Sequence, residues 1–267
     1  MLRKPRKHFS CNLLPRTDPR YIIWLNSLKK KRRCEPWNKS KTRFTDKRIK
    51  KISETFLRKK IDNFSNWRIN ARNSGLIPNP NRSFKHSKEL AFLIGMTLGD
   101  GCLQKISRTE SLRITLGSNR PLLIAYTANI VGKVINKKPS VIKRNCSNCF
   151  NVTLYQNNLS KRLEVPLGAR KNLKIMLPNW IWSKKSFLVS ALSGLFEAEG
   201  SFSIHKPTYT YNFSFSNVNV SLLDEVEKAL KLLNFHPERR SKEVRLRKKE
   251  EALRFEKLIS FRNYPLI

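Results

Sequence analysis

Two apolar segments of this chain end alike, in an acid followed by glycine. The first spans residues 89–101 as ELAFLIGMTLGDG, and the second spans residues 187–200 as FLVSALSGLFEAEG. Their length and their content of Leu and Ala predict a helix for each segment, with Asp100 and Glu199 near the two helix ends. A chain that carries two copies of one unit is constrained to fold as two similar halves.

Small residues recur at four-residue spacing in both segments. They are Gly95 and Gly99 in the first segment and Ser190, Gly194 and Ala198 in the second. A glycine inside a helix costs roughly 1 kcal/mol relative to alanine, and close packing of a second helix can offset that cost. The spacing therefore predicts that the two helices pack backbone to backbone.

Residues typical of helix ends border both segments. Ser87 and Ser183 precede them and are predicted to be N-caps, while Gly101 and Gly200 follow them and are predicted to close the helices at the C-terminal end. These residues set the expected limits of the two helices.

The two acids lie at helix ends where the helix dipole is negative and disfavours a carboxylate. If the helices pack as a pair, Asp100 and Glu199 also repel each other, and a divalent cation would relieve both costs. The alternative is two solvated ends of unrelated core helices. Because the whole segment recurs, and a strand pattern follows each copy, a shared cation site is favoured.

Apolar residues alternate with polar residues after each segment, as in strands with one buried face. In the first copy, residues 102–108 and 111–116 are predicted to be paired strands with a turn at Thr109 and Glu110. The face predicted to point inward in the second copy consists of Phe202, Ile204, Tyr211, Phe213 and Phe215.

The two motifs, LIGMTLGDG and LSGLFEAEG, resemble those of a single-chain LAGLIDADG homing endonuclease. The resemblance covers about two thirds of the chain, from Ser87 onward. It implies a mixed α+β fold of two pseudo-symmetric αββαββα repeats, with the motif helices at the interface and two four-stranded sheets over duplex DNA. The expected domains are a basic, mostly helical extension at 1–86, a first repeat at 87–183 and a second repeat at 184–267.

The resemblance also implies that the last acid of each motif binds divalent metal, Mg²⁺ or Mn²⁺. These acids are Asp100 and Glu199, and the residues before them, Gly99 and Ala198, are expected in the same metal site. Glu197 lies on a different face of its helix, and we interpret it as structural.

The family often has a basic residue after the fourth strand of each repeat, near the active water. Lys248 or Lys249 fits this position in the second repeat, whereas the first repeat has Gln156 instead. The two half-sites are therefore expected to be unequal.

Polar residues on the outer sheet faces are candidates for reading base edges in the major groove, because such reading needs a row of donors and acceptors. Any single one of them is more typical of a solvated surface residue than of a base contact, and only the set predicts a DNA-binding surface. The candidates from the resemblance are Gln104, Arg108, Arg113 and Thr115 in the first repeat, and Ser203, His205, Asn212 and Ser214 in the second.

The charge of the chain is strongly positive, with 55 Lys and Arg against 19 Asp and Glu. Such a chain favours a polyanion, with nucleic acid first, although a ribosomal or membrane-surface protein would have the same balance. Residues 1–86 carry 25 of these cations and 5 acids. Short helices are predicted there, one of them capped by Thr45; the segment fits either a small DNA-binding appendage or a solvated basic tail.

The sequence predicts a site-specific, metal-dependent DNA endonuclease that acts as a monomer on a long, loosely palindromic duplex site. The main alternative is a maturase that binds intron RNA, or a DNA-binding regulator, on the same fold without cleavage activity. A basic ribosomal protein would leave the paired motifs unexplained. The sequence shows neither an apolar run long enough to cross a membrane nor a secretory signal, so an intracellular protein located with the DNA is expected, in a bacterial or archaeal cytoplasm or an organelle matrix.

Overall fold

The chain forms two units in a computed structural model, residues 1–70 and residues 71–267. The structure describes residues 17, 19–31, 37–59, 64–77, 79, 82–107, 109–145 and 147–264. We describe each unit by itself. The division into an extension at 1–86 and repeats at 87–183 and 184–267 remains our proposal.

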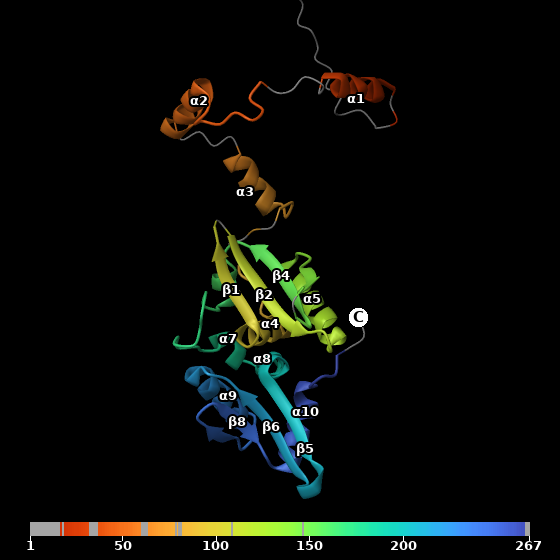
Figure 1. The fold of residues 1–267 in the computed structure, drawn as a ribbon, viewed down its shortest axis with the longest axis vertical. Coiled ribbons are helices and arrows are strands. Elements are labelled where there is room, and N and C mark those ends of the chain that lie inside the picture. Colours follow the sequence, from red (N-terminus) through yellow and green to blue (C-terminus); the bar gives the residue numbers. More distant parts are fainter. Residues whose placement is uncertain are drawn as a thin grey trace, which may run out of the picture. The chain divides into compact units, whose positions relative to one another are not determined.

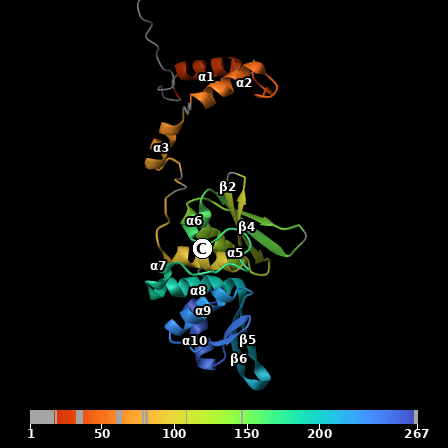
Figure 2. The same ribbon diagram turned by 90° about the vertical axis from the view of Figure 1, so that its left-hand side faces the viewer.

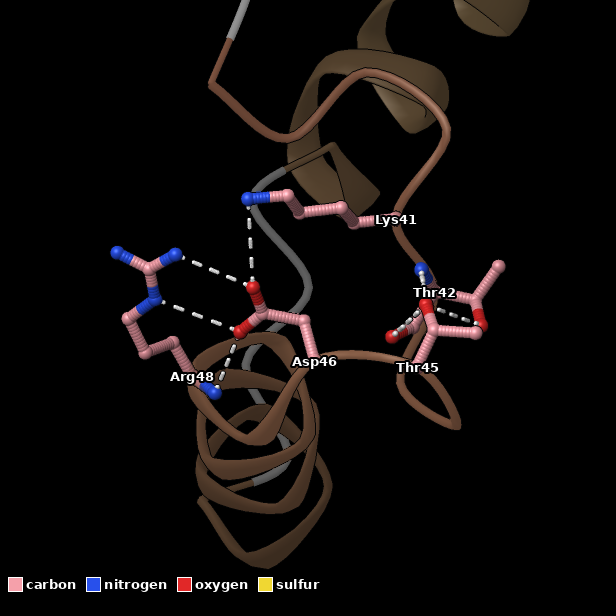
Figure 3. Close-up of polar contacts among 5 residues, drawn as sticks. All are labelled: Lys41, Thr42, Thr45, Asp46 and Arg48. Atoms are coloured by element: carbon pink, nitrogen blue, oxygen red, sulfur yellow. Dashed lines mark hydrogen bonds and ion pairs between the residues drawn. The ribbon is translucent and has the colours of Figure 1, made fainter.

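Three helices are described in the basic N-terminal part: α1 (Pro19–Lys31), α2 (Lys47–Arg58) and α3 (Ser65–Asn73), the last of which runs across the unit boundary. The N-cap of α2 is Asp46, whose carboxylate accepts a hydrogen bond of 2.8 Å from the backbone N–H of Arg48. Thr45 was predicted to have this role, and that prediction is wrong. Its hydroxyl oxygen instead accepts a bond of 2.8 Å from the backbone N–H of Thr42 in the preceding turn (Figure 3).

The second unit contains the same succession of elements twice, which confirms the mixed α+β fold predicted from the sequence. Each copy folds its four strands into one antiparallel sheet, in the orders β1-β2-β4-β3 and β5-β6-β8-β7. The first copy consists of α4 (Lys88–Leu98), β1 (Gly101–Ile106), β2 (Thr109–Gly117), α5 (Pro121–Ile135), β3 (Ser140–Lys143), β4 (Cys149–Gln156) and α6 (Leu159–Leu163). The short helix α7 (Asn179–Trp182) leads to the second copy: α8 (Lys185–Glu199), β5 (Gly200–His205), β6 (Thr210–Ser216), α9 (Val220–Leu232), β7 (Glu238–Arg240), β8 (Glu243–Leu246) and α10 (Lys249–Ile259).

The two motif helices, α4 and α8, lie side by side between the two sheets of this unit (Figures 1 and 2). A Cβ atom built on Gly95 would overlap the backbone oxygen of Ala191, and one built on Gly194 would overlap that of Phe92. Only glycine leaves room for such an approach of two backbones. The close packing predicted from the small-residue spacing is thus seen at this contact, which we call the helix seam.

Helix α4 begins as predicted, because the Ser87 hydroxyl accepts a hydrogen bond of 3.1 Å from the backbone N–H of Leu90. The prediction for Ser183 is wrong. Its hydroxyl donates a bond of 2.6 Å to the carbonyl of Trp180 at the end of α7, and α8 begins after Lys184 without a side-chain cap.

Glycine is needed after each acid for a different reason from the one predicted. Gly101 and Gly200 are the first residues of β1 and β5, and neither has the positive φ of a helix-closing glycine. A Cβ atom on Gly101 would overlap the backbone of Thr97, and one on Gly200 would overlap that of Phe196. The chain therefore turns from helix to strand so tightly that a side chain does not fit.

The sheets of the two copies have the same register next to the helices, with Gly101 opposite Ile114 and Gly200 opposite Phe215. The first hairpin turns earlier than predicted. Ile106 pairs with Thr109, so the chain reverses before Thr109, which belongs to β2.

The inner sheet faces form the core together with the motif helices. In the second copy, Phe213 and Phe215 are fully buried and contact Phe196 of α8 at ring distances of 5.1 and 5.5 Å. Ile204 was predicted to point inward, but it is 44% exposed because the β5–β6 hairpin extends beyond the core.

Candidate active site

Asp100 and Glu199 lie at the C-terminal ends of the two seam helices. Helix α8 ends with Glu199, whereas α4 ends at Leu98, so that Asp100 follows the helix and its C-cap, Gly99. Gly99 and Ala198 face each other here, since a Cβ atom on Gly99 would overlap that of Ala198. The seam thus brings together all four residues predicted for the metal site.

The surroundings of the two acids disfavour their charged forms. Loss of water raises the pKa of Asp100 to about 6, although the positive charge of Arg120 acts in the opposite direction. Loss of water also raises the pKa of Glu199, and the negative charge of Asp100 raises it further. The two carboxylates are therefore close enough to repel each other, as expected for acids that share one cation site.

Two arginines near the acids had no distinguishing signal in the sequence. Arg120 precedes α5 and donates a hydrogen bond of 3.2 Å to the backbone oxygen of Glu197. Arg170 lies between α6 and α7, where its Nη2 donates to the carbonyl oxygen of Gly101. The charge of Arg170 lowers the pKa of Glu199, so both arginines act on the acid pair.

Arg170 is itself held in an unusual state. Burial lowers its pKa, and its Nη1 is buried without a hydrogen-bond partner in the described part of the chain. Leaving a buried donor of a charged group without an acceptor is costly. Beside the carboxylate of Glu199, this guanidinium thus holds one donor that an additional oxygen ligand, such as a phosphate, would satisfy.

Asn217 also contacts the acid pair. It lies between β6 and α9, and its side-chain amide donates a hydrogen bond to Oε2 of Glu199, which counteracts the rise in the pKa of that acid. The carboxylate of Glu199 is thereby fixed by a neutral amide, while Asp100 has the charged Arg120 in its surroundings. The two acids differ in their environment even though the helices that present them match.

Glu197 has the structural role that the sequence suggested. It is 1% exposed, and its carboxylate accepts hydrogen bonds from the backbone N–H of Arg262 and from the hydroxyl of Tyr264. Burial raises the pKa of Glu197, and these two bonds act against that rise. The side chain therefore fastens the C-terminal tail to α8 and does not share the site with Glu199.

The structure does not bring Gln156, Lys248 or Lys249, which were predicted at the catalytic site, to the acids. Gln156 pairs with Glu110 at the far end of β4, and its side-chain oxygen accepts a bond of 2.9 Å from Arg162. Lys248 lies 3.7 Å from Glu251, and Lys249 lies over the ring of Tyr211 at 5.6 Å.

The sheet register gives the reason for this correction. Glu110 and Tyr211 are opposite Lys105 and Ile204, whereas the strands leave the acids at Gly101 and Gly200. Lys105 is four residues beyond Gly101, and Ile204 is four residues beyond Gly200. At about 3.3 Å per residue, these positions lie about 13 Å along the strand from the residues that follow the acids. The positively charged neighbours of the acids are Arg120 and Arg170 instead.

The residues predicted to contact DNA share the outer faces of the two sheets, because each alternates with core residues of its strand. Gln104, Arg113, Ser203 and His205 are exposed, and Thr115 and Asn212 are half-buried. Ser214 is only 5% exposed, which contradicts the prediction of an open donor at this position. Arg108 lies outside the described residues.

A charged pair next to Ser214 was missed in the sequence. Arg245 of β8 is opposite Ser214, and its Nε and Nη2 donate bonds of 3.0 and 2.8 Å to Glu238 of β7. A row of polar side chains thus crosses the outer face from Ser201 to Glu238. In the first sheet the corresponding row ends in neutral Thr153 and Ser140, so the two outer faces differ in charge pattern.

The residues at the seam suit a divalent cation in their chemistry. Carboxylates are oxygen ligands that Mg²⁺ prefers, and the negative charge of Asp100 raises the pKa of Glu199, a cost that a shared cation would relieve. In the described ranges no group of three or more His, Cys, Asp or Glu side chains gathers to hold a metal. The fit therefore rests on one acid from each helix.

The chain has two similar αββαββα repeats, which join through paired helices that each lead to an acid. This arrangement is the one that the resemblance to LAGLIDADG proteins implies. Residues 186–260 match the model of the LAGLIDADG-like domain. This match covers the second repeat and confirms the resemblance to the LAGLIDADG family that the motifs indicated.

Solved structures of this type resemble the chain at low identity. The homing endonuclease I-DmoI in complex with DNA and Mn is 16% identical over 64% of this chain and 96% of its own, with a TM-score of 0.46. I-WcaI bound to its DNA recognition sequence is 16% identical over 67% and 84%, with a TM-score of 0.46. The N-terminal LAGLIDADG domain of DUF199/WhiA is 20% identical over 67% and 87%, with a TM-score of 0.44.

No curated protein matches this sequence. In the described part of the chain, no helix is both long and apolar enough to cross a membrane.

Proposed function

We propose that this protein is a site-specific DNA endonuclease that hydrolyses phosphodiester bonds in duplex DNA with divalent metal ions, Mg²⁺ or Mn²⁺. The observation that carries this proposal is the pair of acids at the end of the helix seam. Asp100 and Glu199 come from two repeats related by an internal twofold, so the site can address two strands of a twofold-symmetric duplex.

The residues of the site have separate roles in this proposal. Asp100 and Glu199 hold the metal, with Gly99 and Ala198 beside them. A bound divalent cation lowers the pKa of an attacking water and neutralises charge on the phosphoryl oxygens. Arg170, with its buried and unpaired Nη1, is placed to bind a phosphate oxygen near the acids.

The outer sheet faces bind the duplex in this proposal. Gln104 and Arg113 in the first repeat, and Ser203 and His205 in the second, are exposed polar side chains that can reach base edges. Because the two faces carry different charges, the target is only loosely palindromic. The twofold is internal, so a monomer suffices, and the protein acts inside the cell, where the DNA is.

The alternative is a DNA-binding regulator or an intron-RNA maturase without cleavage activity. The first repeat has Gln156 in place of a basic residue, and neither Lys248 nor Lys249 is found beside the acids, which favours this alternative. Retention of an acid at both motif ends favours the endonuclease.

Cleavage of a randomised duplex-DNA library in Mg²⁺ tests the proposal. We expect sequence-specific cuts in both strands by the intact protein, and their loss in Asp100→Asn and in Glu199→Gln, with binding retained in both. Asp224→Asn, which changes an exposed acid on α9, is the matched control and should cleave normally. Selective binding without cleavage by the intact protein would instead support the alternative.

A further inference from the structure

Residues 37–59, which we call the aromatic–basic segment, have no part in the proposed active site. The segment consists of a turn region followed by α2 and carries nine Lys and Arg but only two acids. Both acids are engaged within the segment. Asp46 lies 3.2 Å from Arg48 and 3.6 Å from Lys41 (Figure 3), and Glu54 lies 4.0 Å from Lys50.

Large apolar rings of this segment lie open to water. Phe44 is 83% exposed, Trp37 is 54% exposed and Phe56 is 42% exposed, and none of the residues of α2 is buried. Three exposed rings in one short segment indicate a binding surface more than singly scattered apolar residues would. The rings therefore point to an occupant that covers them.

Each of the two rings that precede α2 lies beside a guanidinium. The Arg43 guanidinium lies 4.7 Å from the centre of the Phe44 ring, and the Arg48 guanidinium lies 4.9 Å from that of Trp37. Asp46 fixes the pair of Arg48 and Trp37, because one carboxylate caps α2 and also holds the side chain of Arg48. Aromatic faces and positive charges are thus presented together on a short, locally ordered scaffold.

We propose that the aromatic–basic segment binds single-stranded nucleic acid, with bases stacked on Trp37 and Phe44 and with phosphates at the surrounding Lys and Arg. A single strand offers unpaired bases as well as phosphates, and base–aromatic stacking combined with a basic surface is how proteins bind it without sequence preference. An intact duplex keeps its bases stacked inside and would leave both rings uncovered. This activity is separate from the proposed cleavage of duplex DNA.

A membrane surface is less suited to this segment. A helix that lies in a membrane interface gathers its apolar groups on one of its own faces. Ile52 and Phe56 form such a face on α2, but Trp37 and Phe44 precede the helix and each lies beside an arginine, which matches the alternation of base and phosphate in a nucleic-acid strand. The positive charge of the segment would serve either partner.

The test compares the full-length protein with the double variant Trp37→Ala/Phe44→Ala by fluorescence anisotropy. The labelled probes are oligouridine RNA, oligothymidine DNA of equal length and a duplex of unrelated sequence. Base stacking contributes about 1–3 kcal/mol for each base, so we expect the variant to bind at least one of the single strands about fivefold or more weakly. Duplex binding should stay unchanged, since it does not use the rings.

Two further variants separate stacking from charge. Leu76→Ala removes an apolar side chain that is 71% exposed outside the segment, and it should leave all probes unaffected. Lys47→Gln/Lys51→Gln should weaken the single strands and the duplex alike and reduce the salt dependence of binding. A strand bound only as RNA, or only as DNA, identifies which of the two is the ligand.

Equal binding of both single strands by the intact protein and the ring variant would overturn the proposal. It would also be overturned if the ring variant lost binding only to phosphatidylserine vesicles, which would assign the surface to a membrane. Cleavage of duplex DNA is measured on the same variants, so failure here is distinguishable from failure of the endonuclease proposal.

Discussion

The two repeats of this protein match at the helix seam and in the register of their sheets, but they differ in the residues that fill their cores. Gly95 meets the backbone of α8 where Gly194 meets that of α4, and both sheets leave the helices in the same register. Around this common frame, the first core is aliphatic, with Leu103, Leu112 and Ile114, whereas the second is built on phenylalanine rings. A fixed backbone contact evidently tolerates different cores on its two sides.

The contrast is sharpest at one pair of equivalent positions. Leu98 of the first motif corresponds to Glu197 of the second, and both side chains are buried. Glu197 is matched by the C-terminal tail, whose Tyr264 also lies 5.4 Å from the ring of Tyr126 on α5 of the first repeat. The buried carboxyl group of the second copy is therefore accommodated by the C-terminal segment, which contacts both repeats.

The largest effect is expected from alanine at the seam. Gly95→Ala and Gly194→Ala each place a methyl group onto a backbone oxygen, which cannot move without shifting a helix. We expect each variant to lose about 3 kcal/mol or more of unfolding free energy, at the upper end of overpacking effects, and to a similar extent in both. Urea unfolding followed by circular dichroism measures this loss.

Gly132→Ala is the matched control. Gly132 lies inside α5, where a Cβ atom would meet its nearest neighbour at an ordinary 3.7 Å. Alanine should therefore stabilise the helix there by roughly 0.5–1 kcal/mol. A seam variant that is as stable as this control, or a large difference between the two seam variants, would contradict the matched seam.

A smaller effect is expected when the second repeat is made to resemble the first. Glu197→Leu introduces the residue found at the equivalent position, Leu98, but leaves the N–H of Arg262 and the hydroxyl of Tyr264 without an acceptor. Hydrogen bonds to a charged group contribute about 1.5–3 kcal/mol each, and part of this loss returns because Arg262 is exposed to water and a buried carboxylate is removed. We expect a net loss of about 2 kcal/mol in thermal or urea unfolding.

Tyr264→Phe sharpens this test, because it keeps the ring beside Tyr126 and removes only the hydroxyl. Its effect should be about 1–2 kcal/mol in the parent and close to zero when Glu197 is already leucine. Additive losses in the double variant would show that the two side chains do not act together.

The smallest effect concerns an ion pair that is described in the first repeat, between Lys133 of α5 and Glu89 of α4, at 2.8 Å. Its hydrogen bond from Lys133 lowers the pKa of Glu89 to about 2. A lowered pKa means that the pair stabilises the protein above the ordinary glutamate pKa, and that this contribution disappears as the pH falls from about 4.5 to about 2. Because both side chains are partly exposed, the contribution is small.

Lys133→Gln should therefore lower the Tm by about 1–2 °C at pH 7 and low salt, and by nothing measurable near pH 2. Glu89→Gln serves as the control and should show the same pH dependence. A difference between Lys133→Gln and the parent that persists at pH 2, or in 1 M salt, would mean that packing of the lysine stem is responsible.

Much of the fold could be predicted because it follows from patterns within short stretches of sequence. The spacing of Gly95 and Gly99 indicated the seam, and the alternation around Leu112 and Ile114 indicated a strand with one buried face. Such patterns report the local environment directly. Errors arose at element ends, where Asp46 and Thr45 are both good caps by type and the backbone path decides between them.

The site was predictable only in part, because contacts between distant residues leave no local pattern. The acids stand out by their place in a repeated motif, but Arg120 and Arg170 are two cations among 55 Lys and Arg. Ser214 could not be recognised as covered, since Arg245 reaches its row from another strand. The roles of Lys248 and Lys249 failed for the same reason: only the register shows how far they are from the acids.

The reciprocal contact at the seam has a consequence for how such a chain can change over generations. Gly95 packs against the backbone of the second copy and Gly194 against that of the first. The effect of a substitution at either glycine therefore depends on the backbone of the other copy. The two repeats can therefore differ in their sheets, loops and DNA contacts, provided that the residues of the helix seam remain compatible with each other. Repeats taken from two such proteins should combine into one folded chain when their seam helices have matching small residues, even where the rest of their sequences differ.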